Sequence, residues 1–211
     1  MPRTIESFLI DGPAGKLEAM LEAPESGPPH SLALVCHPHP LYGGSMHNKV
    51  VHRLARGLRR NGAAVLRFNF RGVGRSQGSH DRGAGEIEDA RAGLAWLRTR
   101  YPELSYTLAG FSFGSRVVLG LGCELRSAAA VVAAGFPTRA GSLDTLLDCR
   151  APKIFIQSTQ DQYGPRQELE MLFARLPEPK RLVWVQAADH FFRGALDAFE
   201  EAVVSLGQLP A

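Results

Sequence analysis

Short apolar segments alternate with longer amphipathic segments along most of this chain of 211 residues, and the alternation limits the possible folds more than any single motif. Apolar runs of strand length occupy residues 31–37, 63–70, 104–110, 128–136, 151–159 and 181–187. Amphipathic patterns predict helices over residues 46–60, 84–100, 113–121, 166–175 and 192–206. Strands separated by helices indicate an α/β fold, in which a mostly parallel sheet carries helices on both faces.

The N-terminal part of the chain is expected to add a hairpin to this sheet. Residues 5–10 and 16–23 have strand character and flank Asp11-Gly12-Pro13, a combination typical of a turn. The composition, 45% hydrophobic and 21% charged, is that of a globular protein, and the length suits a single domain over residues 1–211. Because the net charge of +3 is small and the arginines are scattered, we expect no nucleic-acid partner.

The sequence also predicts where the protein resides. The N-terminus shows no apolar region after its first basic residue, and no run reaches the roughly 18 apolar residues of a membrane span, so we expect neither a secretory signal nor a membrane partner. Cys36, Cys123 and Cys149 lie among apolar residues, which predicts reduced core thiols in a cytoplasmic protein and no disulfide. Cys36 could be a thiol nucleophile, but a small buried residue at a strand end is favoured.

Residues 110–114, Gly-Phe-Ser-Phe-Gly, form a G-x-S-x-G motif between an apolar strand and a helix. This context is typical of a nucleophile elbow, a sharp turn that holds a serine hydroxyl above the sheet. Gly110 and Gly114 lack the side chains that would keep the strand and the helix apart. The serine also lies at a helix N-terminus, where the helix dipole favours developing negative charge. Ser112 is therefore the candidate nucleophile.

A serine nucleophile needs a base, and the base needs an acid that orients it. The one histidine downstream of Ser112 is His190, which closely follows the strand expected over 181–187. Asp161 follows the strand before it, so the chain order is Ser, Asp, His. Each of the three residues comes soon after a strand, which is where parallel sheets carry their functional sites.

Three other aspartates are alternatives for the acid. Asp189 is adjacent to His190, so its side chain should diverge from the imidazole, and we expect it to order the loop instead. Asp144 and Asp148 would serve only if the acid came one strand earlier in the chain.

Histidines also gather directly after the strand over 31–37. A catalytic zinc would need three protein ligands, here His37, His39 and either His47 or His52, and no carboxylate lies nearby, so we expect no metal. A nucleotide-binding loop over residues 71–78 is equally disfavoured, because glutamine stands in place of the third glycine of the motif and no acidic residue lies at the expected distance.

Several motifs together resemble the α/β-hydrolase superfamily, and most closely its small bacterial members without a cap domain, near dienelactone hydrolases and predicted esterases. The matching segments are HPHPLYGGSMHNK (37–49), FNFRGVGRSQG (68–78), AGFSFGS (109–115), QDQYGP (160–165) and ADHFF (188–192). The resemblance implies an eight-stranded sheet whose second strand is antiparallel, a Ser112–Asp161–His190 triad and no cofactor. Too few residues lie between 137 and 151 for a cap domain.

The same resemblance implies an oxyanion hole, in which two backbone N–H groups hold the oxygen of a tetrahedral intermediate. One N–H should come from Phe113, the residue after the nucleophile. The other should come from the loop after the third strand, where Pro38 and Pro40 have no N–H. His39 is therefore the best candidate and Leu41 the second.

Apolar residues beside these positions suggest a substrate pocket formed by Leu41, Tyr42, Phe111 and Phe191. The expected function is hydrolysis of carboxylic esters, with a small acyl compound as the binding partner. A peptidase or amidase with the same triad and a catalytically idle binding scaffold are the alternatives. The sequence does not distinguish a monomer from a homodimer.

Overall fold

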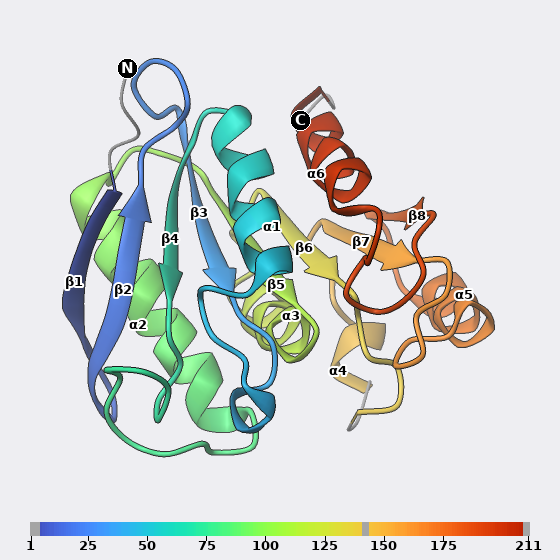
Figure 1. Cartoon of the computed structure of the whole chain (residues 1–211), viewed down its shortest axis with the longest axis horizontal. Helices are drawn as coiled ribbons and strands as arrows, with labels where there is room; N and C mark the ends of the chain where they lie inside the picture. The colour runs from blue at the N-terminus through green and yellow to red at the C-terminus, as the bar shows by residue number, and fades with distance from the viewer. Residues whose placement is uncertain (1–4, 141–143, 209–211) are drawn as a thin grey trace.

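The computed structural model describes residues 5–140 and 144–208, in which eight strands form one sheet (Figure 1). The strands are β1 (Ile5–Gly12), β2 (Gly15–Glu22), β3 (Ser31–Cys36), β4 (Ala63–Phe68), β5 (Tyr106–Phe111), β6 (Ala130–Ala134), β7 (Lys153–Ser158) and β8 (Lys180–Val185). Their order in the sheet is β1-β2-β4-β3-β5-β6-β7-β8. β1 and β2 form the expected hairpin, β2 pairs antiparallel with β4, and the other neighbours are parallel. The fold class predicted from the sequence is confirmed.

Helices cover both faces of the sheet. They are α1 (Lys49–Arg60), α2 (Ala84–Arg100), α3 (Phe113–Leu125), α4 (Asp144–Leu147), α5 (Arg166–Arg175) and α6 (Leu196–Val204), with short 3-10 turns η1 (Pro40–Tyr42) and η2 (Ser205–Gln208). One hydrophobic core joins the sheet to α1 and α6, and the other joins it to α2, α3 and α5. The connection between β6 and β7 holds α4 in its described part, and no cap domain is inserted there.

Side-chain alternation along the strands explains the two cores. In β3, Leu32 and Leu34 point into the core under α2 and α3, whereas Ala33 and Val35 point into the core under α1 and α6. Both sets are fully buried, which explains why the sequence of β3 is a continuous apolar run without polar alternation.

The cysteines differ from the sequence prediction. Cys36 is a buried thiol at the end of β3, as expected, and burial, followed by the nearby charge of Asp89, raises its pKa. Cys123 and Cys149, however, form a disulfide with a Cα–Cα distance of 4.9 Å. Cys123 lies on α3 and Cys149 follows α4, and these helices pack together although 26 residues separate the cysteines. The cytoplasmic location stays a prediction, and these two cysteines no longer support it.

In the described part of the chain, none of the helices is both long and apolar enough to cross a membrane.

Candidate active site

The turn between β5 and α3 has the geometry of a nucleophile elbow. Ser112 has φ 55° and ψ −119°, a backbone conformation that side-chain-bearing residues rarely adopt, and its N–H donates to Ala134 O at 2.9 Å. A Cβ on Gly110 would lie 2.2 Å from Gly114 O, and a Cβ on Gly114 would lie 2.4 Å from Cys36 O. Only glycine fits at these two positions, because strand, turn and helix approach each other at backbone contact distance.

The structure brings Ser112, Asp161 and His190 together from three separate loops. His190 Nε2 lies 2.9 Å from Ser112 Oγ, and His190 Nδ1 lies 2.7 Å from Asp161 Oδ2. His190 and Asp161 are almost completely buried. Since a carboxylate only accepts hydrogen bonds, Nδ1 carries the proton that Asp161 accepts, which leaves Nε2 to accept the serine proton.

Asp161 is held by more than its contact with His190. Its Oδ1 accepts from the N–H groups of Tyr163 at 2.8 Å and Gly164 at 3.0 Å. Its Oδ2 also accepts from Gln157 Nε2 at 2.9 Å. Gln157 is fully buried on β7, where its Oε1 accepts from Phe136 N and its Nε2 also reaches Gly164 O. The amide therefore ties the carboxylate to two neighbouring segments of backbone.

Sequence reasoning missed Gln157, although one signal was present. It is a polar residue inside the apolar strand β7, four residues before Asp161. A buried amide needs partners for all its polar atoms, so its position indicated a polar group in the interior nearby.

The alternative acids have other surroundings. Asp189 Oδ1 accepts from the N–H groups of Phe191 and Arg193, at 3.0 and 3.1 Å, so it orders the loop as predicted. Asp144 and Asp148 are exposed, within and just after α4, and Asp161 is the carboxylate in contact with His190.

Residues 37–48, here called the His-Pro loop, follow β3 and approach the elbow. His37 is fully buried, accepts from Phe70 N at Nε2 (3.0 Å) and lies 2.6 Å from Pro38 O through Nδ1. Burial lowers the pKa of His37 to about 4, so the ring is neutral and joins two loops. In residues 5–140 and 144–208, no group of three or more His, Cys, Asp or Glu residues is placed to hold a metal ion.

His39 lies beside the elbow, with its ring centroid 4.9 Å from that of Phe113. Its carbonyl accepts from the N–H groups of Tyr42 and Gly44, both at 3.1 Å, and its ring Nδ1 accepts from Leu41 N at 3.3 Å. The N–H of Leu41, the second candidate for the oxyanion hole, is therefore engaged. For the N–H groups of His39 and Phe113, the described residues provide no acceptor.

A cavity of about 480 Å³ opens over Ser112. It is lined by Pro38, His39, Tyr42, Gly43, Gly44, Asn48, Ser112, Phe113, Arg116, Pro137, Ala140, Tyr163, His190 and Phe191. Of the four residues expected to form the substrate pocket, Tyr42 and Phe191 line this cavity and are well exposed. The sequence analysis did not identify Asn48, Arg116 or Tyr163 as part of it.

Two of the expected pocket residues lie elsewhere. Leu41 is exposed at η1 and is not among the residues that line the cavity. Phe111 was expected in the pocket wall, and this is wrong, because the ring is fully buried in the core under α1 and α6. Its ring centroid lies 4.9 Å from that of His190, so it packs against the inner side of the imidazole. Alternation along β5 turns residue 111 into the core just before the chain turns at Ser112.

The chain resembles known proteins in sequence and in fold. A family model described as an alpha/beta hydrolase domain matches residues 34–199. An uncharacterised protein of Rickettsia prowazekii is 36% identical over 203 residues, which cover 92% of this chain and 85% of the relative. The chain therefore belongs to the α/β-hydrolase family.

Solved structures agree with this assignment. An alpha-beta serine hydrolase homologue from Coxiella burnetii is 36% identical, with a TM-score of 0.91 over 95% of this chain and 96% of the other. A serine hydrolase without a lid from Xanthomonas campestris is 35% identical, with a TM-score of 0.90 over 100% of this chain and 98% of the other.

Proposed function

We propose that this protein is a serine hydrolase that cleaves carboxylic esters through an acyl-enzyme. One observation carries the proposal. The Oγ of Ser112, the imidazole of His190 and the carboxylate of Asp161 form a continuous hydrogen-bonded chain with distances of 2.9 and 2.7 Å. The serine end of this chain faces the cavity, and the acid end is buried.

The geometry supports a two-step reaction. His190 Nε2 takes the proton of Ser112 as Oγ attacks the carbonyl carbon of the ester, and Asp161 stabilises the resulting imidazolium. The N–H groups of His39 and Phe113 donate to the oxyanion. His190 then protonates the leaving alcohol. Water, deprotonated by the same imidazole, attacks the acyl carbon and releases the acid and the free serine.

Two further features support hydrolysis of an acyl substrate at Ser112. In the described part of the chain, no cap domain covers the cavity, so an acyl group can reach Ser112 from solvent. The relatives from Coxiella burnetii and Xanthomonas campestris are named as serine hydrolases at 36% and 35% identity.

A fluorophosphonate probe with intact-mass detection, together with turnover of p-nitrophenyl acetate, tests the proposal. Wild-type protein should gain one adduct, whereas Ser112→Ala should gain none. His190→Ala should lose at least roughly 10⁴-fold in kcat, because the nucleophile loses its base. His47→Ala, which removes an exposed imidazole of the His-Pro loop, is the control and should behave as wild type.

Equal labelling of Ser112→Ala and the wild type would reject the proposed nucleophile. Faster turnover of an amino-acyl anilide than of p-nitrophenyl acetate would favour a peptidase or amidase over an esterase.

A further inference from the structure

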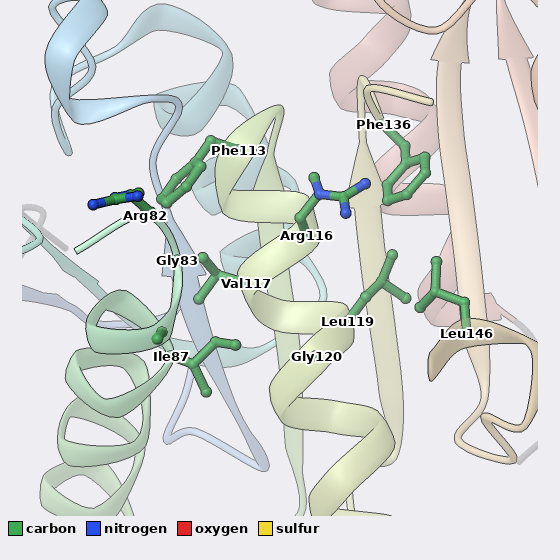
Figure 2. A pocket seen from close by; sticks show the side chains of 11 residues that line it. Arg82, Gly83, Ile87, Phe113, Arg116, Val117, Leu119, Gly120, Phe136 and Leu146 are labelled. Carbon is green, nitrogen blue, oxygen red and sulfur yellow. The ribbon is translucent and has the colours of Figure 1, made fainter. Parts of the chain in front are cut away.

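A second cavity, here called the α2–α3 groove, lies on the outer side of α3 and has a volume of about 380 Å³. Figure 2 shows Ile87 of α2 and Val117 of α3 in the space between these helices, while Leu146 lies on the other side of α3. Phe136, which follows β6, closes the groove beside Arg116. The residues that form its base are mostly apolar.

The groove adjoins the cavity over Ser112. Phe113 and Arg116 line both, and Phe113 directly follows the nucleophile. The groove extends to Gly120, two turns further along α3. At 1.5 Å per residue, the helix rises roughly 10 Å between Phe113 and Gly120.

Gly120 keeps the groove open. Gly114 and Gly122 of the same helix are required by packing, because a Cβ there would lie 2.4 Å from Cys36 O and from Val131 Cγ2, respectively. A Cβ on Gly120 would instead meet only the end of a flexible side chain, Ile87 Cδ1 at 3.1 Å. A glycine inside a helix costs about 1 kcal/mol relative to alanine. Rigid packing does not explain this residue, but the depth of the groove does.

We propose that the α2–α3 groove binds the acyl chain of the substrate, and that the substrates are esters of unbranched acids of medium chain length. The inference rests on the proposed function, since the chain must start at the carbonyl carbon attacked by Ser112. An acyl chain leaving that carbon passes Phe113 and lies along α3 toward Gly120, over the side chains of Val117 and Ile87. Arg82 and Ala84 at the rim are exposed, and Ile87 and Gly120 are half-buried, so each methylene is only partly removed from water.

The test compares uncharged p-nitrophenyl esters from acetate to dodecanoate, because Arg82 and Arg116 also line the groove and would attract charged probes. Full burial of a methylene corresponds to roughly a fourfold gain and partial burial to about twofold. We therefore expect kcat/KM to rise about 16-fold over the four methylenes from butanoate to octanoate and then level off.

Gly120→Leu fills the groove, and Gly120→Ala fills it in part. Gly120→Leu should lose about tenfold in kcat/KM on octanoate and keep its acetate turnover within twofold of the wild type. The kcat/KM of Gly120→Ala on octanoate should lie between those of Gly120→Leu and the wild type. Ala95→Leu is the matched control, since it adds the leucine side chain to an exposed position of α2 outside the groove. Acetate turnover and Tm show whether each variant is folded. If Gly120→Leu is not folded, the kcat/KM of Gly120→Ala on octanoate tests the groove.

The groove assignment would be wrong if kcat/KM of the wild type did not change with acyl length, or if neither Gly120 substitution altered that dependence. The proposed ester hydrolysis would be unaffected by either result. A binding experiment separates the opposite case. In the Ser112→Ala protein, octanamide should bind at least tenfold more tightly than acetamide by calorimetry, and adding Gly120→Leu should remove the difference. If the wild type hydrolysed no ester but this difference in binding was found, the groove assignment would stand and the proposed function would be rejected.

Discussion

The two loops that flank Ser112 are built in different ways. The loop after β7, residues 159–165, fixes Asp161 through side chains, because the carboxylate accepts two backbone N–H groups, the Gln157 amide and the His190 ring. The His-Pro loop fixes His39 through its backbone, with the carbonyl accepting two N–H groups and a 3-10 turn following directly. The acid side is buried, whereas Leu41 and Tyr42 at the tip of the His-Pro loop are exposed.

The difference fits the separate tasks of the two loops in the proposed reaction. A carboxylate must stay charged in a buried place, which requires several donors around it. An oxyanion donor is a backbone N–H, so its position depends on φ and ψ, and the side chain attached to it matters little. Side-chain substitutions should therefore be costly on the acid side, whereas on the oxyanion side the costly changes should be those that alter the backbone.

Outside the Ser112–Asp161–His190 set, the largest expected effect comes from removing an N–H without changing the backbone. His39 has φ −53° and ψ 122°, values that proline also adopts, so His39→Pro should remove the N–H and the ring and leave the backbone conformation in place. We expect kcat to fall by about 10²- to 10³-fold, the usual loss for one oxyanion donor. His39→Ala keeps the N–H and should retain activity within about fivefold, since it loses one long hydrogen bond from Leu41. Equal losses in both variants would show that the ring, and not the N–H, matters.

His37 should make the protein less stable in acid. Its folded-state pKa of about 4 lies below the value of 6.5 for the unfolded chain, so the unfolded state binds more protons between these values. The free energy of unfolding should therefore be unaffected by His37 above pH 6.5 and should fall by about 3 kcal/mol as the pH drops from 7.5 to 4. Urea titrations across this range should show a shallower dependence for His37→Gln. His47→Gln, at an exposed position, should keep the wild-type slope.

Gln157→Leu tests the acid side directly. The variant removes the donor to Asp161 Oδ2, and hydrogen bonds to charged groups contribute about 2 kcal/mol, so kcat should fall roughly 30-fold with KM unchanged. Ser158→Ala is the matched control, because Ser158 is the next residue on β7, is equally buried, and bonds to Ala187 O. If both variants lost stability but neither lost kcat, Gln157 would support the fold without positioning the acid.

The smallest effect is expected from crowding the His-Pro loop. A Cβ on Gly44 would lie 2.1 Å from Pro38 O and 2.6 Å from His39 O, so Gly44→Ala must displace the backbone of His39. We expect kcat to fall about tenfold, a part of the loss that one oxyanion donor causes. Gly43→Ala adds a methyl group where nothing lies within 4 Å, although φ is 76°, so it should lower Tm more than kcat. A larger loss of kcat in Gly43→Ala than in Gly44→Ala would contradict the proposal that the loop backbone positions the His39 N–H.

Much of the fold was predictable from the sequence because strand and helix patterns are local. The alternation of apolar and amphipathic segments predicts six of the strands and the helices α1, α2, α3 and α5 within a few residues, and a turn signal predicts the hairpin. The last helix begins at Leu196 rather than 192, because Phe192 has φ 54° and belongs to the preceding turn. The short η1 and α4 carry too little periodic pattern to be recognised.

The part of the candidate site that could be predicted is the part that follows from the order of residues along the chain. Ser112, Asp161 and His190 each follow a strand, so the topology alone brings them to one edge of the sheet. The roles of Gln157 and Phe111 depend on which face of the sheet each side chain takes at the end of its strand. The strand boundaries predicted from the sequence are not precise enough to define that face. The disulfide and the α2–α3 groove depend on how helices pack.

The Cys123–Cys149 disulfide attaches the far wall of the α2–α3 groove to α3, the helix that begins directly after Ser112, since Leu146 lies three residues before Cys149. Closing a loop of this length stabilises a folded chain by about 3 kcal/mol in the chain-entropy model. Ser112, Asp161 and His190 make no contact that depends on this bond, because their hydrogen bonds run through β7, β6 and the elbow. A reductant in the assay buffer would thus act on substrate selection by acyl length and leave the hydrolysis of acetate esters almost unaltered.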